Sequence, residues 1–113
     1  MHELSIVQSI IDIAETTVVD HRGKNVERID LEIGQLAGVE PAALDFAWET
    51  AIRGTVLEKA ERKIDHIEGV GKCGSCGKEF RMDQLFDPCP VCNSFLNEIV
   101  QGKELKVKSI TIN

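Results

Sequence analysis

Hydrophobic residues near the start of the chain recur at alternating steps of three and four, which is the spacing of one face of an α-helix. This face comprises Leu4, Val7, Ile11, Ala14 and Val18, with Ser5, Gln8, Ser9 and Asp12 on the opposite side. The pattern stops at about Asp20 to Gly23, where His21 is typical of the last turn of a helix. We therefore predict an amphipathic helix that begins within the first few residues and ends there.

An alternating pattern follows over residues 26–33, because Ile29 and Leu31 are separated by charged residues. This period of two predicts a strand with one buried and one solvated face. Two further strands are expected over about residues 60–68 and 104–112. The inner face of the former is ambiguous, because its isoleucines lie in opposite phases.

A second helix is predicted after the loop at residues 34–38. Proline is favoured in the first turn of a helix, so Glu40-Pro41 marks the start of this helix, and Gly54 marks its end. Its apolar face comprises Leu44, Ala47, Trp48 and Ala51. We expect Trp48 and Phe46 to lie in or near the hydrophobic core, because large aromatic side chains bury much apolar area. The alternative is that an aromatic residue not accommodated in the core marks a partner surface.

The segment from about Gly69 to Gly102 differs in composition from the rest of the chain. It contains five of the nine glycines, two of the three prolines and all the cysteines. We therefore predict an α+β fold in which two helices pack on a three-stranded sheet, with an inserted zinc-ribbon-like module. The α/β domain comprises residues 1–68 plus 103–113, and the inserted module comprises residues 69–102.

Four cysteines in the inserted module form two Cys-x-x-Cys pairs, Cys73 with Cys76 and Cys89 with Cys92, separated by twelve residues. Two residues between thiols let both sulfurs point into one turn, and two such turns close a tetrahedral site. Four thiolates fill the coordination shell of Zn²⁺ and leave no position for water, so a structural zinc ion is expected. Rubredoxin-like iron and paired disulfides are the alternatives that the spacing leaves open.

Composition and charge narrow the range of functions. The chain has 13 Lys and Arg against 19 Asp and Glu, and this net charge of -6 disfavours a nucleic-acid partner, whose phosphates attract basic surfaces. The apolar runs are short and no signal-peptide pattern is present, so we expect a cytoplasmic chain without membrane association. In that reducing compartment, four cysteines are more typical of a metal site than of disulfides.

The first three residues, Met1, His2 and Glu3, offer a second set of donor atoms. The α-amine of Met1, the amide nitrogen of His2 and its imidazole can form linked five- and six-membered chelate rings, with the Glu3 amide or carboxylate as a fourth donor. Nitrogen donors in one plane suit square-planar Ni(II) or Cu(II). The ordinary alternative is a solvated histidine in a frayed helix start, and the tripeptide alone does not decide between the two.

Several segments together resemble the HypA/HybF family over nearly the full length of the chain. They are Met-His-Glu-Leu-Ser at the start, Leu-Glu-Ile-Gly-Gln-Leu-Ala-Gly-Val at residues 31–39, Leu44, Phe46, Gly54-Thr55, both Cys-x-x-Cys pairs, and Leu-Lys-Val-Lys-Ser-Ile at residues 105–110. The members of this family are nickel metallochaperones of hydrogenase maturation. The resemblance implies that Ni²⁺ binds through His2 and the neighbouring nitrogens of Met1 and Glu3, and that the four cysteines hold Zn²⁺.

The resemblance also implies partners and a type of activity. The family works with the GTPase HypB to insert nickel into the large subunit of NiFe-hydrogenase, and in some organisms it also serves urease. We therefore expect a nickel carrier without enzymatic activity, as a monomer or a homodimer. The rival hypothesis is a zinc-ribbon module that binds another protein and handles no nickel. His66, just before the inserted module, is interpreted as an exposed strand histidine or as a further residue near nickel.

Overall fold

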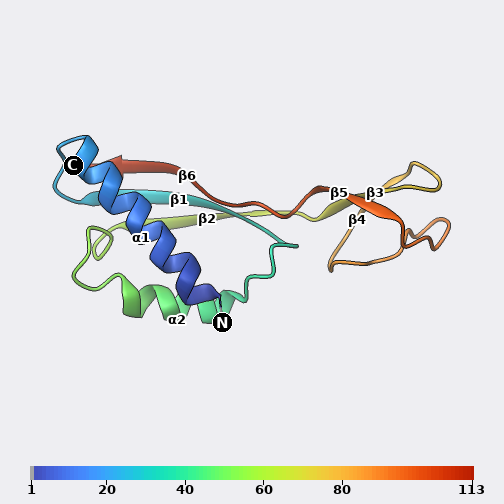
Figure 1. Ribbon diagram of the computed structural model, residues 1–113, viewed down its shortest axis with the longest axis horizontal. Helices are drawn as coiled ribbons and strands as arrows, with labels where there is room; N and C mark the ends of the chain where they lie inside the picture. Colours follow the sequence, from blue (N-terminus) through green and yellow to red (C-terminus); the bar gives the residue numbers. More distant parts are fainter. Residues whose placement is uncertain (1) are drawn as a thin grey trace. The chain divides into compact units, whose positions relative to one another are not determined.

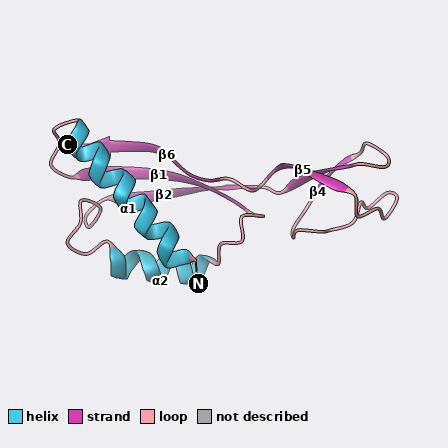
Figure 2. Cartoon of the chain, viewed as in Figure 1, coloured by secondary structure: helices cyan, strands magenta, loops and turns pink. Residues whose placement is uncertain are grey.

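The structure, a computed structural model, describes residues 2–113, which contain two α-helices and six β-strands. In chain order these are α1 (Glu3–Asp20), β1 (Val26–Gly34), α2 (Pro41–Ala51), β2 (Glu61–Ile67), β3 (Val70–Cys73), β4 (Glu79–Arg81), β5 (Asn97–Gln101) and β6 (Leu105–Ile112) (Figure 1, Figure 2). The strands form two three-stranded sheets, ordered β2-β1-β6 and β4-β3-β5. The α+β class and both predicted helices are confirmed.

The chain divides into two compact units. The first, here called the helical unit, comprises Met1–Leu31, Val39–Ile64 and Val107–Asn113. The second, here called the cysteine unit, comprises Glu32–Gly38 and Asp65–Lys106. Strands β1, β2 and β6 each begin in one unit and end in the other, so three strands connect the two units.

In the helical unit, α1 and α2 cover one face of the sheet formed by β1, β2 and β6 (Figure 1). The core of this unit consists of Val7, Ile10, Ile11, Ala14, Val18, Val26, Ile29, Leu31, Leu44, Ala47, Trp48 and Leu57. Burying a Val, Leu or Ile side chain contributes about 1.5–3 kcal/mol relative to leaving it in water. The apolar stripe of α1 and the alternating face of β1 are therefore what hold the helices against the sheet.

Hydrogen bonds near the two ends of β1 show the directions of its neighbours. They join Asn25 to Asn113 and Gly34 to Glu104 on the β6 side, and Val26 to Val56 and Gln35 to Ile67 on the β2 side. The order of these partners makes β6 antiparallel and β2 parallel to β1. A parallel neighbour needs a crossover connection, and α2 supplies it.

Helix α2 begins at Pro41, as predicted, and Glu40 is its N-cap residue. The Glu40 carboxylate accepts a 3.0 Å hydrogen bond from the amide of Ala42. This contact satisfies one of the N–H groups that have no partner within the first turn of a helix. The local sequence therefore determines where α2 starts.

The two aromatic residues of α2 have different environments. Trp48 is 5% exposed and lies in the core with Leu44 and Ala47, as predicted. The prediction for Phe46 was wrong, because its side chain is 73% exposed. Positions three and four apart share a helix face, so Leu44 and Ala47 lie on the buried face of α2. Phe46 lies on the opposite, solvent-exposed face.

The cysteine unit is built on β3, which pairs antiparallel with β4 and with β5. Its core is the buried cluster of Leu36, Cys73, Phe80, Met82 and Cys89, against which Ile99 packs. A Cβ atom on Gly71 would lie 2.3 Å from the sulfur of Met82, so β3 needs a glycine there. A core this small supplies little hydrophobic stabilisation by itself.

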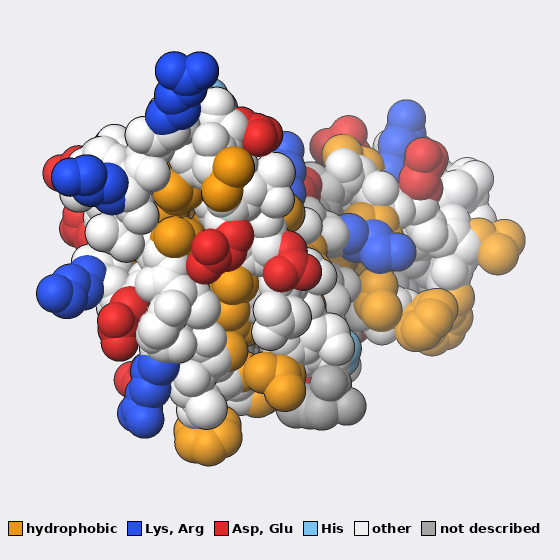
Figure 3. Space-filling model, turned by 60° about the vertical axis from the view of Figure 1, so that its left-hand side comes forward, with side chains coloured by type: hydrophobic (Ala, Val, Ile, Leu, Met, Phe, Trp, Pro, Cys, Tyr) orange, Lys and Arg blue, Asp and Glu red, His pale blue; other side chains and the backbone are white. Residues whose placement is uncertain are grey.

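The surface carries charged side chains of both signs, and exposed hydrophobic side chains lie among them in separate groups (Figure 3). Among the exposed apolar residues of the cysteine unit are Leu85, Phe86, Val91, Phe95 and Leu96. Neither helix in the described part of the chain has the length and apolar content that crossing a membrane requires.

Candidate metal centre and the N-terminal residues

The four cysteines come together in the cysteine unit, with all four Sγ atoms within 4.8 Å of one another. Cys73 Sγ lies 3.5 Å from Cys92 Sγ, and Cys76 Sγ lies 3.7 Å from Cys89 Sγ. Sulfurs at the corners of a tetrahedron with Zn–S distances of about 2.3 Å lie about 3.8 Å apart. The four sulfurs are therefore spaced as ligands of one tetrahedral ion.

Each Cys-x-x-Cys pair lies in a tight turn whose backbone faces the sulfur atoms. The amides of Ser75 and Cys76 donate to Cys73 Sγ at 3.3 and 3.4 Å, and the amide of Val91 donates to Cys89 Sγ at 3.4 Å. Such bonds stabilise a thiolate and orient it. The two turns thus present their sulfurs in the same way.

A residue with positive φ closes each turn. Gly77 has φ of 76° and Asn93 has φ of 60°. Their amides donate to the carbonyl groups of the first cysteine of each pair, Cys73 and Cys89, at 3.0 and 2.8 Å. Glycine and asparagine tolerate this left-handed conformation better than other residues do, so the residue types at both positions suit the turns.

The two buried cysteines have thiols that ionise easily. The N–H groups of Cys76 and Ser75 donate to Cys73 and, against the effect of burial, lower its pKa to about 6. The N–H groups of Cys92 and Val91 likewise lower the pKa of Cys89. The thiolate of Cys73 is therefore favoured near neutral pH, and ionisation of Cys89 is made easier.

The two exposed cysteines behave in the opposite way. The N–H of Ser94 lowers the pKa of Cys92, but the sulfur of Cys73, burial and the other sulfurs outweigh this contact and raise the pKa to about 11. The pKa of Cys76 is also raised, because burial and its sulfur neighbours outweigh the N–H of Lys78. Adjacent thiolates repel one another, so all four ionise together only around a cation. The residues present therefore fit a divalent, thiolate-binding metal such as Zn²⁺.

Side chains around the site link the two turns to each other. Ser75 Oγ donates to Ser94 Oγ at 3.1 Å. Asn97 Nδ2 donates to the carbonyl groups of Asp87 and Ser94 at 2.9 and 3.1 Å. These bonds hold the second turn against the start of β5.

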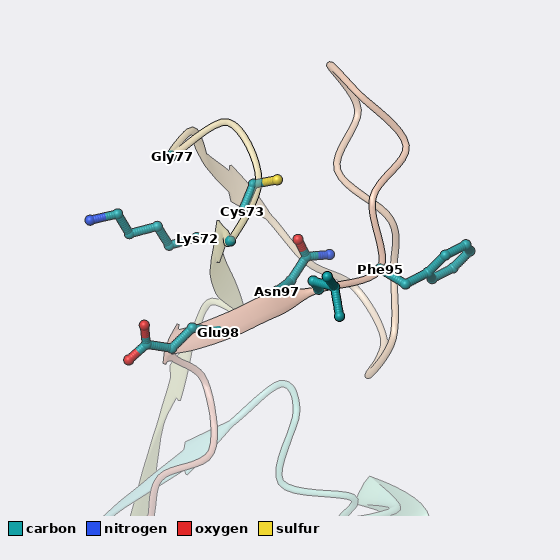
Figure 4. Close-up of a pocket in the computed structure, with 8 residues that line it drawn as sticks. Lys72, Cys73, Gly77, Phe95, Asn97 and Glu98 are labelled. Atoms are coloured by element: carbon teal, nitrogen blue, oxygen red, sulfur yellow. The ribbon is translucent and has the colours of Figure 1, made fainter.

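A shallow hollow lies beside the cysteines and includes one of them, Cys73, in its lining (Figure 4). Its other lining residues include Lys72 and Glu98, which extend to one side, and Phe95, which points to the other. The labelled side chains diverge and do not converge on one point. The hollow therefore offers no arrangement suited to acid–base or nucleophilic chemistry.

At the other predicted site, His2 is the N-cap residue of α1 and its side chain is 60% exposed. Glu3 is buried, with 3% exposure. One carboxylate oxygen of Glu3, Oε2, lies 3.4 Å from His2 Nε2 and accepts a 3.1 Å hydrogen bond from the amide of Glu40. The structure thus brings His2 and Glu3 together, whereas the predicted role of Met1 lies outside the described residues.

The pKa of Glu3 is lowered, mainly by the hydrogen bond from the Glu40 amide. Burial opposes this effect, and the Glu3 amide and the charge of a protonated His2 support it. Glu3 is therefore a fixed carboxylate next to the exposed imidazole.

Sequence reasoning missed the contact between Glu3 and Glu40. A charged residue within the first turn of an amphipathic helix is usually solvated, and no local pattern indicates that position 3 is buried. The acidic residue at position 3 and the helix start at Glu40-Pro41 were a signal for this contact. The signal can be read only when it is known that the two helices begin side by side. His66 lies in β2 with an exposed side chain, and its role near nickel stays a prediction.

Comparison with known proteins gives a consistent result. Residues 1–112 match the family described as hydrogenase/urease nickel incorporation, metallochaperone, hypA. The hydrogenase maturation factor HypA of Parabacteroides distasonis is 51% identical over 113 residues, covering 99% of this chain and 97% of that protein. The hydrogenase maturation factor HypA of Geobacter metallireducens is 44% identical, with 99% of each chain covered.

Solved structures with the same fold include the solution structure of the Ni metallochaperone HypA from Helicobacter pylori. It is 26% identical with a TM-score of 0.68, and the match covers 99% of this chain and 97% of that one. A second solution structure, of a HypA protein, is 27% identical with a TM-score of 0.69, covering 100% and 97% of the two chains.

Proposed function

The chain belongs to the HypA family of nickel metallochaperones of hydrogenase maturation, and from this premise we propose that Met1, His2 and Glu3 bind the Ni²⁺ that it carries. The observation that carries the proposal is the pairing of an exposed His2 with a buried carboxylate, Glu3, whose orientation the Glu40 amide fixes. One residue is accessible to an incoming ion, and its neighbour is held in place. This combination suits a site that must gain and lose a metal.

The proposed donor atoms follow from the covalent structure of the first two residues. A six-membered ring that includes the His2 amide nitrogen is closed by Nδ1 of the imidazole, and the α-amine of Met1 closes a five-membered ring on the other side. This choice leaves Nε2 of His2 facing Glu3 Oε2 at 3.4 Å. Metal-bound histidines commonly donate their second ring N–H to a carboxylate, which fixes the ring orientation. A planar nitrogen set suits square-planar Ni(II).

The buried charge of Glu3 has a second role. The N-terminus of a helix carries a partial positive charge that disfavours a bound cation. The pKa of Glu3 is lowered, so its carboxylate is ionised at neutral pH and supplies a compensating negative charge beside His2. The same carboxylate thus orients the imidazole and offsets the dipole of α1.

Cys73, Cys76, Cys89 and Cys92 are proposed to hold one Zn²⁺. A filled shell of four thiolates provides no open coordination position, so this ion stabilises the fold and takes no part in exchange. The proposed zinc-binding module, residues 69–102, lies within the cysteine unit, whose own core contains few residues. Residues 1–68 with 103–113 are the proposed nickel-binding domain.

The carrier role defines the partners. We propose that the chain acts in the cytoplasm, without catalysing a reaction itself, as a monomer or a homodimer. It would work with the GTPase HypB and transfer Ni²⁺ to the large subunit of NiFe-hydrogenase. Urease is a second proposed recipient, because the family description names it.

Calorimetric titration with NiCl₂ tests the nickel site. The protein is zinc-loaded and untagged, with a free α-amine at Met1. We expect wild type to bind one Ni²⁺ per chain and His2→Ala to lose this binding. His21→Ala is the matched control, because His21 is an exposed histidine at the other end of α1, and it should bind like wild type. Unchanged nickel binding by His2→Ala would rule out the proposed ligand set. Absence of nickel binding by wild type would favour the zinc-ribbon interaction module.

A further inference from the structure

The segment Gly34–Gly38, which comprises the last residue of β1 and the loop after it, belongs to the cysteine unit and is here called the strap. The amide of Gly34 donates to Glu104 at 2.7 Å, and the amide of Leu36 donates to Gly102 at 2.7 Å. A turn bond from Ala37 to Gly34, 3.1 Å long, closes the strap on itself. These three backbone hydrogen bonds leave the strap little freedom to move within its unit.

The side chain of Leu36 is 4% exposed and belongs to the same buried cluster as Cys73 and Cys89. It lies against two glycines. A Cβ atom on Gly69 would come within 2.9 Å of Leu36 Cγ, and one on Gly102 within 3.2 Å of Leu36 Cδ1. Leu36 therefore fills a space that these glycines leave open, next to two of the proposed zinc ligands.

Gln35 secures the other side of the strap. Its Oε1 accepts from the amide of Gly69 at 3.2 Å, and its Nε2 donates to Asp83 Oδ1 at 3.1 Å. The Gln35 amide also donates to Ile67 at 2.8 Å. Hydrogen bonds thus fix Gln35 within the cysteine unit, and packing fixes Leu36.

Three residues separate Leu36 from Glu40, and Glu40 belongs to the helical unit. Glu40 provides the amide that holds the Glu3 carboxylate at 3.1 Å. Four peptide steps reach at most about 14 Å, so an anchored Leu36 limits how far the Glu40 amide can move away from it. No contact between the two units is needed for this link.

We propose that Gln35 and Leu36 are positioning residues of the N-terminal nickel site. By anchoring the strap, they keep the Glu40 amide on the Glu3 carboxylate, which in turn orients His2. This inference rests on the proposed nickel ligands. It assigns to an uncharged loop, remote in sequence from the first three residues, a part in setting nickel affinity.

The test uses the full-length, zinc-loaded, untagged chain and the variant Leu36→Ala. Leu57→Ala is the matched control, because Leu57 is an equally buried leucine of the helical unit that lies outside the strap. Leu36→Met serves as the conservative rescue. Three quantities are measured: zinc content, Ni²⁺ affinity with the absorption spectrum of the bound ion, and hydrogen exchange of the Glu40 amide without nickel.

We expect Leu36→Ala to retain one Zn²⁺, to bind Ni²⁺ roughly tenfold more weakly with an altered spectrum, and to exchange the Glu40 amide roughly tenfold faster. Leu36→Met should restore all three properties, and Leu57→Ala should leave nickel affinity unchanged. If Leu36→Ala loses zinc, Gln35→Ala replaces it, because Gln35 is exposed and its loss creates no cavity.

The inference would be overturned if the strap variants had the same nickel affinity and the same Glu40 exchange rate as wild type. It would also be overturned if Leu57→Ala lost as much nickel affinity as Leu36→Ala. Failure of the proposed function has a different signature. In that case wild type and His2→Ala bind nickel alike, while Glu40 exchange, measured without nickel, still reports whether the strap fixes this amide.

Discussion

The carboxylate of Glu3 accepts a hydrogen bond from the amide of Glu40, 37 residues further along the chain. The first of these residues begins α1 and the second is the N-cap of α2, so one side chain joins the starts of both helices. The proposed nickel ligand His2 directly precedes this junction. The exposed side chain of His2 thus adjoins a carboxylate that is buried and hydrogen-bonded.

Neutralising Glu3 should weaken nickel binding. We expect Glu3→Gln to lower Ni²⁺ affinity roughly tenfold, because the amide keeps the shape but loses the charge that orients His2 and offsets the helix dipole. Glu15→Gln is the control: Glu15 also lies in α1 and accepts from a backbone amide, that of Val56, at 3.2 Å. Equal affinity losses in the two variants, measured by calorimetry, would assign the effect to helix stability.

Extending the chain before Met1 should abolish nickel binding. A Gly-Ser extension converts the α-amine into a peptide amide, whose nitrogen is far less basic and is no longer a free amine donor. We expect the extended protein to keep its zinc and fold but to lose the Ni²⁺ absorption band. The same two residues added after Asn113 should change nothing, and an extended protein with normal nickel affinity would remove the α-amine from the ligand set.

Zinc binding should release protons and strengthen with pH. Cys73, with a pKa of about 6, is already a thiolate at neutral pH, whereas Cys92, with a pKa of about 11, and Cys76, with a raised pKa, are protonated. Zinc must therefore displace at least two protons, and its apparent affinity should rise about a hundredfold per pH unit near neutrality. Competition with a chelator at several pH values measures this slope, and a flat profile would contradict the four-thiolate assignment.

Asp30 should make the helical unit sensitive to acid. Hydrogen bonds from Arg28, and then from Ser109, lower the pKa of Asp30 below its usual 3.8. A carboxyl of this kind contributes stability that is complete above the unfolded pKa and is lost as the pH falls through the folded pKa. Asp30→Asn should therefore lower the Tm at about pH 6, and the difference should shrink toward about pH 2. Thermal melts followed by helix circular dichroism test this, and a difference independent of pH would contradict it.

The two aromatic residues of α2 should differ in their contribution to stability. Trp48→Ala removes a core side chain and should reduce the free energy of unfolding by about 3–5 kcal/mol. Phe46→Ala changes an exposed side chain and should cost less than about 0.5 kcal/mol. Denaturant unfolding of both variants measures the two values. A large loss for Phe46→Ala would mean that this ring is buried in solution, for instance against another molecule.

The elements that repeat a local pattern were predictable from the sequence. The stripe of Val7, Ile11 and Ala14 predicts α1, the alternation around Ile29 and Leu31 predicts β1, and the spacing of the cysteines predicts the cluster. Contacts between distant segments were not, because nothing near Glu3 or Leu36 in the sequence reports what covers it. Phe46 shows the limit of composition: an aromatic residue in a helix is buried only if its position falls on the inner face.

The division of the cysteine unit into Glu32–Gly38 and Asp65–Lys106 affects how the protein is made. The ribosome releases Leu36 long before Phe80, Met82, Cys89 and Gly102, so the pocket for this leucine does not exist when the strap leaves the exit tunnel. Leu36 therefore stays in water until most of the polypeptide has been translated. If the strap positions the proposed nickel site, that site is completed only after the last third of the chain has been synthesised.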